Sequence, residues 1–228
     1  MAEFVRYAIY WLPKGPLGRW GEGWLGWQMA TGMPLPRPVV PGLPMPLPDL
    51  TAAATAYGLH ATLKPPFALA PGQDQGALRR AFAAFCTTER TVVVPGLRLT
   101  NLDGFMALTP AGDNAAVKAL ARNAVAALDP FRAPPGAAEL ARRRSAGLTD
   151  RQEALLQRWS YPYVMDEFRF HVTLTGRVNT DQAAQVRAVL GPLVAPHLEP
   201  QLQINGLGLV GQMAQGGFKL IEHHEFPG

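Results

Sequence analysis

Short runs of alternating hydrophobic and polar residues recur along the chain, and they predict strands separated by amphipathic helices. A proline-rich stretch over residues 33–48 interrupts the pattern, because proline blocks both helix and ladder hydrogen bonds. We expect strands over residues 5–11, 60–63, 91–100, 105–108, 168–175, 201–210 and 218–225. We expect helices over residues 15–29, 73–86, 113–128, 137–144, 149–159 and 179–193.

One order of elements occurs twice: a strand, a strand that carries a histidine, a helix and a strand. The two histidines concerned, His60 and His171, are 111 positions apart (171 minus 60). A repeat of mixed elements in each half of a chain indicates two similar units packed together. The pattern therefore predicts a duplicated α+β lobe.

The composition is that of a globular protein, with 48% hydrophobic and 17% charged residues among 228. No unbroken apolar run is long enough to span a membrane, and residues 1–7 lack the features of a secretion signal. The single cysteine, Cys86, has no partner for an internal disulfide, and we interpret it as a buried, unreactive thiol. Together these features predict a cytoplasmic protein without membrane association.

The net charge of +4 is mildly basic and suits an anionic substrate. Apart from residues 142–144, the basic residues are scattered, and no basic run is interleaved with aromatic residues. A groove for single-stranded nucleic acid would need such interleaving. We therefore expect a small anionic substrate as the partner, and the histidine motifs described below indicate that it is phosphorylated. Nucleic acid is allowed but not favoured, and the sequence does not indicate the oligomeric state.

The pattern His-x-Thr-Leu occurs once in each half of the chain. Because side chains alternate between the faces of a strand, His60 and Thr62 share one face while the residues beside them face a core. The same holds for His171 and Thr173. Each motif therefore presents one imidazole and one hydroxyl side by side.

Two such half-sites suit the opening of a phosphodiester without a metal. One imidazole takes a proton from the attacking water, and the other protonates the leaving oxygen, because imidazole titrates near neutral pH. The threonine hydroxyls donate to the non-bridging oxygens as charge develops there. The pseudo-symmetry leaves open which histidine is the base and which is the acid.

The other histidines do not form a comparable pair. His223 and His224 are adjacent, so they point to opposite faces of a strand, and His197 lies between proline and leucine in an expected loop. A zinc site at the paired histidines would need a third ligand, for which only Asp166 and Glu167 are candidates. We expect neither a metal nor a cofactor.

At these residues the sequence resembles the two-histidine phosphoesterase superfamily, and more narrowly its bacterial branch associated with genes of phosphonate metabolism. The resemblance extends over most of the chain and is weakest in the proline-rich stretch. Position 59 is Leu where the branch has Phe. The matching stretches are residues 6–10, 57–67, 128–132, 141–144, 159–163 and 168–176.

The resemblance implies an α+β fold of two duplicated lobes, each an antiparallel sheet with helices on its outer face, around a central cleft. Residues 1–228 would form this single bilobal domain. It also implies a metal-independent cyclic phosphodiesterase acting on a small sugar or ribosyl cyclic phosphate. Two alternatives stay open. One is an RNA-end 2′,3′-cyclic phosphodiesterase or 2′–5′ RNA ligase-like enzyme, and the other is a module that binds nucleotides without turnover.

Further residues are candidates for contacts with the substrate. Strand alternation puts Lys64 on the first catalytic face, and Arg169 and Thr175 on the second. One arginine of residues 142–144, with Arg143 as our choice, would reach a second phosphate. Tyrosines would stack on a ribose or base, with core packing as their alternative role: Tyr7, Tyr10, Tyr57, Tyr161 and Tyr163.

Overall fold

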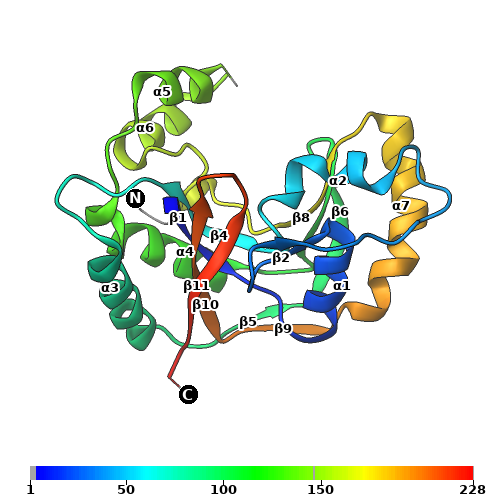
Figure 1. Cartoon of the computed structure of the whole chain (residues 1–228), viewed down its shortest axis with the longest axis horizontal. Coiled ribbons are helices and arrows are strands. Elements are labelled where there is room, and N and C mark those ends of the chain that lie inside the picture. The colour runs from blue at the N-terminus through cyan, green and yellow to red at the C-terminus, as the bar shows by residue number, and fades with distance from the viewer. Residues whose placement is uncertain (1–3, 146, 228) are drawn as a thin grey trace.

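A seven-stranded antiparallel sheet crosses the computed structural model, which describes residues 4–145 and 147–227 (Figure 1). Its strands lie in the order β11 (Phe218–Glu225), β10 (Gly206–Met213), β1 (Phe4–Trp11), β4 (Ala61–Phe67), β8 (Val172–Arg177), β7 (Phe105–Pro110) and β6 (Leu97–Leu102). Two small sheets pair β2 (Trp27–Gln28) with β3 (Met33–Pro34), and β5 (Val92–Pro95) with β9 (Gln201–Ile204).

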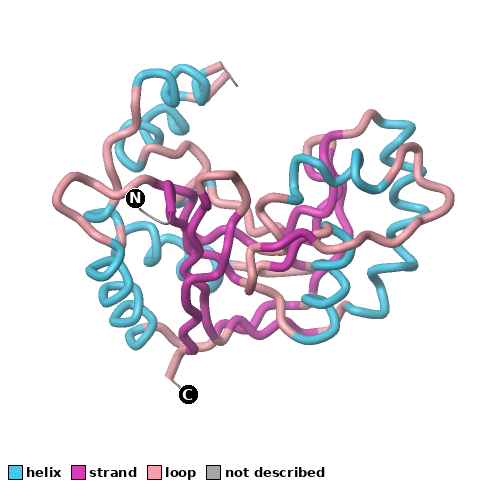
Figure 2. The backbone as a smooth tube through the Cα atoms, viewed as in Figure 1, coloured by secondary structure: helices cyan, strands magenta, loops and turns pink. Residues whose placement is uncertain are grey.

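Seven α-helices pack around the strands in the described part of the chain (Figure 2). They are α1 (Gly15–Leu25), α2 (Leu47–Thr55), α3 (Gln75–Thr88), α4 (Ala115–Ala127), α5 (Ala137–Arg144), α6 (Asp150–Trp159) and α7 (Thr180–Val194). Helices α6 and α7 begin at capping boxes on Thr149 and Asn179, which satisfy two free N–H groups each. None of the helices in the described residues is both long and apolar enough to cross a bilayer.

The helices lie in three groups around the central strands (Figure 1). Helices α3 and α4 lie on one side, and α1, α2 and α7 lie on the other. Helices α5 and α6 project as an arm above the start of β1, and α5 contains no buried residue. One hydrophobic core joins both halves of the chain and includes Leu63 and Phe67 from β4 together with Leu174 and Leu190. The predicted α+β fold with antiparallel strands and outer helices is confirmed.

Several element boundaries differ from those predicted. The strand expected over residues 91–100 is two strands in different sheets, β5 and β6, separated at Gly96. The Gly96 N–H donates to Pro200 O, and a side chain there would collide with the Glu199 carbonyl. The strand expected over residues 201–210 divides in the same way into β9 and β10. A hydrophobic run alone does not show where a chain passes from one sheet to another.

The first motif strand does not stop at its prolines, as predicted, but continues through Pro65 and Pro66 to Phe67. Two features of the pairing explain this. Strand β4 pairs with β8 only at Ala61, so beyond that residue one side of β4 has no ladder partner. Its register with β1 also shifts between Thr62 and Phe67. Proline is tolerated where a strand edge or a bulge needs no N–H donor.

Candidate active site

The two motif strands meet at a single residue pair, Ala61 opposite Val172. Both side chains are buried in the core, at 1% and 0% exposure. The residues on either side of an antiparallel pair face each other across the strands on the opposite face. His60 therefore lies beside Thr173, and Thr62 lies beside His171.

This pairing gathers the four motif side chains around one point on the sheet. Directly opposite residues have Cβ atoms about 5 Å apart, and diagonal neighbours are about 7–8 Å apart. The two imidazoles are the diagonal neighbours, and a positive charge on His171 adds to burial, the larger cause, in lowering the pKa of His60.

Each imidazole is oriented by the main-chain carbonyl two residues before it. His60 Nδ1 lies 3.0 Å from Gly58 O, and His171 Nδ1 lies 2.8 Å from Arg169 O. A carbonyl oxygen only accepts, so Nδ1 carries the hydrogen in both rings. The Nε2 atom is then the one available for proton transfer. In His60 this atom lies 3.0 Å from Thr62 Oγ1, whose hydroxyl donates to it.

His60 is the more enclosed of the two rings. Tyr10 stacks on it with ring centroids 3.8 Å apart, and Tyr57 lies farther out at 6.2 Å. Burial lowers the pKa of His60 to about 4, although its hydrogen bond to Gly58 opposes this shift. Burial also lowers the pKa of His171 below its ordinary value. Both imidazoles are therefore neutral at neutral pH in the absence of a bound anion.

A cleft of about 490 Å³ opens over His171 and Thr62. Its walls come from several elements: the strand β4, the turn between β6 and β7, the segment between α6 and β8, and the end of β8. Polar and aromatic residues lining it include Asp103, Phe105, Gln152, Tyr161, Tyr163, Arg169 and Arg177. Larger cavities lie elsewhere, but they contain neither of the paired histidines.

Four of the five candidate tyrosines lie around this site. Tyr10 and Tyr57 stack on His60, while Tyr161 and Tyr163 line the cleft and contact each other edge to face. Tyr7 lies elsewhere, because alternation along β1 turns it to the opposite face from Tyr10. There it is buried against Phe4 and Phe67, and its hydroxyl donates to Gln75 of α3.

The structure does not place Lys64 on the catalytic face, in contrast to the alternation prediction. Tyr10 pairs with Thr62, but Ile9 pairs with Lys64, so one extra residue of β4 bulges between them. The bulge turns Lys64 to the opposite face, where it is buried and donates to Val125 O at 3.0 Å. Burial lowers the pKa of Lys64 to about 8, and Asp129 opposes this shift.

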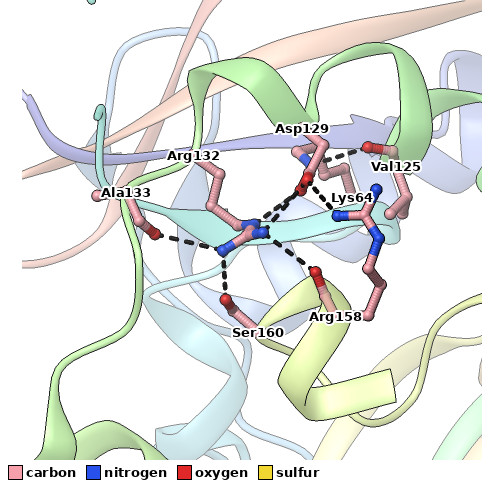
Figure 3. A network of polar contacts seen from close by, with 7 residues as sticks. All are labelled: Lys64, Val125, Asp129, Arg132, Ala133, Arg158 and Ser160. Carbon is pink, nitrogen blue, oxygen red and sulfur yellow. Dashed lines mark hydrogen bonds and ion pairs between the residues drawn. The ribbon is translucent and has the colours of Figure 1, made fainter. Parts of the chain in front are cut away.

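Asp129 is the centre of the polar network around Lys64 (Figure 3). Its carboxylate lies 3.8 Å from Lys64, 2.8 Å from Arg132 and 3.5 Å from Arg158. Arg132 also donates to the hydroxyl of Ser160, the residue in left-handed conformation that ends α6. The network therefore joins the motif strand β4 to the segment that carries Tyr161.

Thr175 is also placed differently from the prediction. The register between β8 and β7 shifts around this residue, because Ala107 pairs with Thr173 but Phe105 pairs with Arg177. Thr175 is buried at this bulge, where its hydroxyl accepts from Met106 N at 2.9 Å and so replaces a ladder bond. Arg169 does line the cleft, as an exposed side chain paired with Asp103 at 3.2 Å.

The sequence analysis did not single out Arg6, which lies on the same face of β1 as Tyr10. Its Nε donates to Gln212 at 2.7 Å, and its charge acts on the phenol of Tyr10. The same period-two alternation that relates the motif residues would have identified it. Among the described residues, no group of three or more His, Cys, Asp or Glu side chains is arranged to hold a metal ion.

Similar solved structures include Escherichia coli LigT complexed with NADP+, at 11% identity, TM-score 0.45 and 100% coverage of both chains. TT0787 of Thermus thermophilus is 16% identical at TM-score 0.45, over 96% of this chain and 97% of that one. At these values, the ligands of those proteins say nothing about the substrate of this chain.

The chain belongs to the family described as "Protein of unknown function (DUF1045)", whose model matches residues 62–219. Two curated relatives are named ribose 1,5-bisphosphate phosphokinase PhnN. The relative from Janthinobacterium sp. (strain Marseille) is 43% identical over 76% of this chain and 39% of its own length. The relative from Laribacter hongkongensis (strain HLHK9) is 38% identical over 77% of this chain and 41% of its own length. The chain thus spans about two fifths of the relatives that it matches.

Proposed function

We propose that this protein is a metal-independent cyclic phosphodiesterase in which His60 and His171 exchange protons with water and the leaving oxygen. The observation that carries the proposal is the pairing of Ala61 with Val172, which puts both imidazoles and both threonine hydroxyls on one face. The matched Nδ1 contacts of the two rings support it further, because they leave Nε2 of each ring available for the reaction.

The proposed reaction adds water across one P–O bond of the cyclic diester. The water oxygen attacks phosphorus while the basic imidazole takes its proton at Nε2. The P–O bond opposite the attacking water breaks, and the acidic imidazole gives its proton to the leaving alkoxide. The products are a phosphomonoester and a free hydroxyl group. Thr62 and Thr173 donate to the non-bridging oxygens, where negative charge builds up.

We assign the base to His60 and the acid to His171. His60 has its pKa lowered to about 4, so it is in the neutral form over nearly the whole accessible pH range. His171 lines the open cleft, where a bound phosphodiester anion raises its pKa by Coulombic attraction. A bound anion therefore favours the protonated form of the acid.

The names of the curated relatives support a ribosyl substrate. Opening the O2–phosphorus bond of a 5-phosphoribosyl 1,2-cyclic phosphate leaves the phosphate on C1 and yields ribose 1,5-bisphosphate. A phosphokinase for that compound would consume the product. We do not assign phosphoryl transfer to this chain, because it lacks the Gly-Lys pair of a P-loop.

The test is hydrolysis of ribose 1,2-cyclic phosphate, its 5-phosphate and nucleoside 2′,3′-cyclic phosphates, each with and without chelator. We expect turnover of a ribosyl substrate that chelator does not change. His60→Gln and His171→Gln should each lower kcat by about 10²- to 10⁴-fold, as loss of a general acid or base does. His197→Gln, a change at a half-buried histidine of another cavity, is the matched control.

Three outcomes would contradict the proposal or its substrate. Near-full turnover in either histidine variant would exclude the paired acid–base mechanism. Product binding without hydrolysis of any cyclic phosphate would indicate a binding module instead. Preference for RNA ends, with an affinity that falls steeply as salt rises, would indicate RNA processing, because many phosphates are then neutralised.

A further inference from the structure

A groove lies between α4 and α6, outside the catalytic cleft, and both helices are labelled in Figure 1. Its volume is about 730 Å³, which is in the range of small-molecule sites in proteins. None of the residues that line it also lines the catalytic cleft. The two helices meet beneath it, where Val125 of α4 and Leu155 of α6 belong to one buried cluster. The groove is therefore a separate cavity with a packed base.

Helical spacing brings four cations to this groove. Lys118 and Arg122 are four positions apart, so they share one face of α4. Arg151 and Arg158 are seven positions apart, which is two turns, and share one face of α6. Asp166 is the one carboxylate residue that lines the groove. Four cations against one carboxylate leave three positive charges here, in a chain whose net charge is +4.

The basic run over residues 142–144 is not part of this groove. Arg143 lies over the ring of Tyr161, with its Cζ atom 4.5 Å from the centroid, and pairs with Glu139 at 3.4 Å. Arg144 pairs with a glutamate of α6 at 2.6 Å. The run that is conspicuous in the sequence therefore has carboxylates of its own, whereas the fold gathers a second set of cations from scattered positions.

The cations of the groove are only partly neutralised by the protein. On α6, Arg151 pairs with Asp166 at 2.5 Å, and Arg158 lies 3.5 Å from Asp129. The side chains of the two cations on α4 have no ion pair or hydrogen bond within the described part of the chain. Their charge is therefore available to an anion from outside.

The groove favours a ligand recognised by charge rather than by ring stacking. Arg158 covers one face of Trp159, with its Cζ atom 4.3 Å from the ring centroid. Trp159 and Met165 also pack against the buried cluster that contains Leu155, which is 3% exposed. The large apolar side chains of the groove are thus already in contact with the protein.

The arrangement of the cations indicates the shape of the anion. Along the helix axes, the pair on α4 is separated by about 6 Å and the pair on α6 by about 10 Å, at 1.5 Å per residue. Guanidinium and ammonium groups both bind phosphate oxygens. A linear chain of phosphate groups can follow the two rows of cations and contact several of them at once.

We propose that the groove between α4 and α6 is a second anion site, which binds a linear oligophosphate through Lys118, Arg122, Arg151 and Arg158. This site goes beyond the proposed reaction and does not depend on it. The two cations of α4 supply charge that the protein leaves unpaired, and those of α6 extend the row. Because Arg158 also lies near Asp129, a ligand bound there would touch the polar network behind the motif strand β4.

Calorimetry with sodium tripolyphosphate at low ionic strength tests the site. We expect the wild type to bind and the double variant Lys118→Gln/Arg122→Gln to bind about 10- to 100-fold more weakly, because charge-assisted contacts are lost. The matched control is Arg19→Gln/Arg98→Gln, which removes the same charge from exposed positions on α1 and β6. The control should bind as the wild type does.

Two comparisons separate this site from the catalytic cleft and identify the group that is recognised. His60→Gln should keep the binding of tripolyphosphate, so the result holds even if no cyclic phosphate is hydrolysed. Adenosine triphosphate should bind about as tightly as tripolyphosphate, and adenosine should not bind.

Four outcomes would overturn the site. They are no binding by the wild type, equal weakening in both double variants, and loss of binding in His60→Gln but not in Lys118→Gln/Arg122→Gln. The fourth is a single-stranded oligonucleotide that binds through Lys118 and Arg122 when tripolyphosphate does not, which would indicate a surface for nucleic acid instead.

Discussion

At the scale of single residues, the protonation of the paired imidazoles would set the pH range of the proposed reaction. The base must be neutral, which holds above the pKa of about 4 of His60. The acid must be protonated, which holds below the pKa of His171, a value that burial keeps under the ordinary 6.5.

We therefore expect a bell-shaped profile of kcat/KM against pH, because this parameter reports the free enzyme. Its acidic limb should lie near pH 4 and its basic limb below pH 6.5, with the kcat profile displaced upward by the bound anion. The shape of this profile would be the same if His171 were the base and His60 the acid, because it depends only on the two pKa values. Initial rates between pH 3.5 and 9 measure it, and a kcat/KM that still rises above pH 7 would contradict this assignment of protonation states.

The threonine hydroxyls make a separate prediction. Thr173→Val and Thr62→Val keep the shape of the side chain but remove the donor to the developing charge on phosphate. We expect kcat to fall by about 10²-fold in each, with a small change in KM, since the contact strengthens only in the transition state. Thr100→Val, outside the cleft on β6, should leave both parameters unchanged. Steady-state kinetics at the pH optimum test this.

How much of the site the sequence could predict depends on the regularity of its strands. Alternation places His60 beside Thr62, as the structure has them, because the two residues precede the bulge of β4. It fails for Lys64 and Thr175, which lie beyond bulges in β4 and β8. A bulge depends on cross-strand pairing, so the sequence of one strand does not reveal it. The catalytic roles themselves stay predictions.

At the scale of elements, the helices were the easiest to predict, because their ends have local causes. Helix α5 spans residues 137–144 as predicted, and α6 and α7 begin at Thr149 and Asn179, whose side chains accept from the third residue of each helix. The second motif strand was harder. It begins only at Val172, because the residues before it lie along the cleft and pair with no strand.

The network at Asp129 connects elements and allows a prediction about stability. Asp129→Asn leaves Lys64 and Arg132 buried without a carboxylate, at 3% and 14% side-chain exposure. Breaking one side of a buried ion pair costs about 3 kcal/mol of unfolding free energy, because the remaining charge is uncompensated. Urea denaturation measures the loss. Lys64→Met in the same background should recover part of it, and a double variant no more stable than Asp129→Asn would contradict the account.

At the scale of the whole molecule, the two halves share one core despite their internal repeat. Residues of β4 and of α7 belong to the same hydrophobic cluster. A shared core of this kind favours cooperative unfolding. We expect one urea transition, with coincident curves from tryptophan fluorescence and far-UV circular dichroism. Two separated transitions would show that the halves are independent units and would contradict the expected single bilobal domain.

The contact between Ala61 and Val172 also has a consequence for synthesis of the chain. The ribosome completes the first motif long before the second, so a nascent or prematurely terminated polypeptide would contain only one of the two proposed catalytic histidines. Catalysis would begin only when the late segment docks beside the early one. We expect two separately expressed fragments, divided between the motifs, to be inactive alone and to regain turnover on mixing. Turnover would then report that the two segments have assembled.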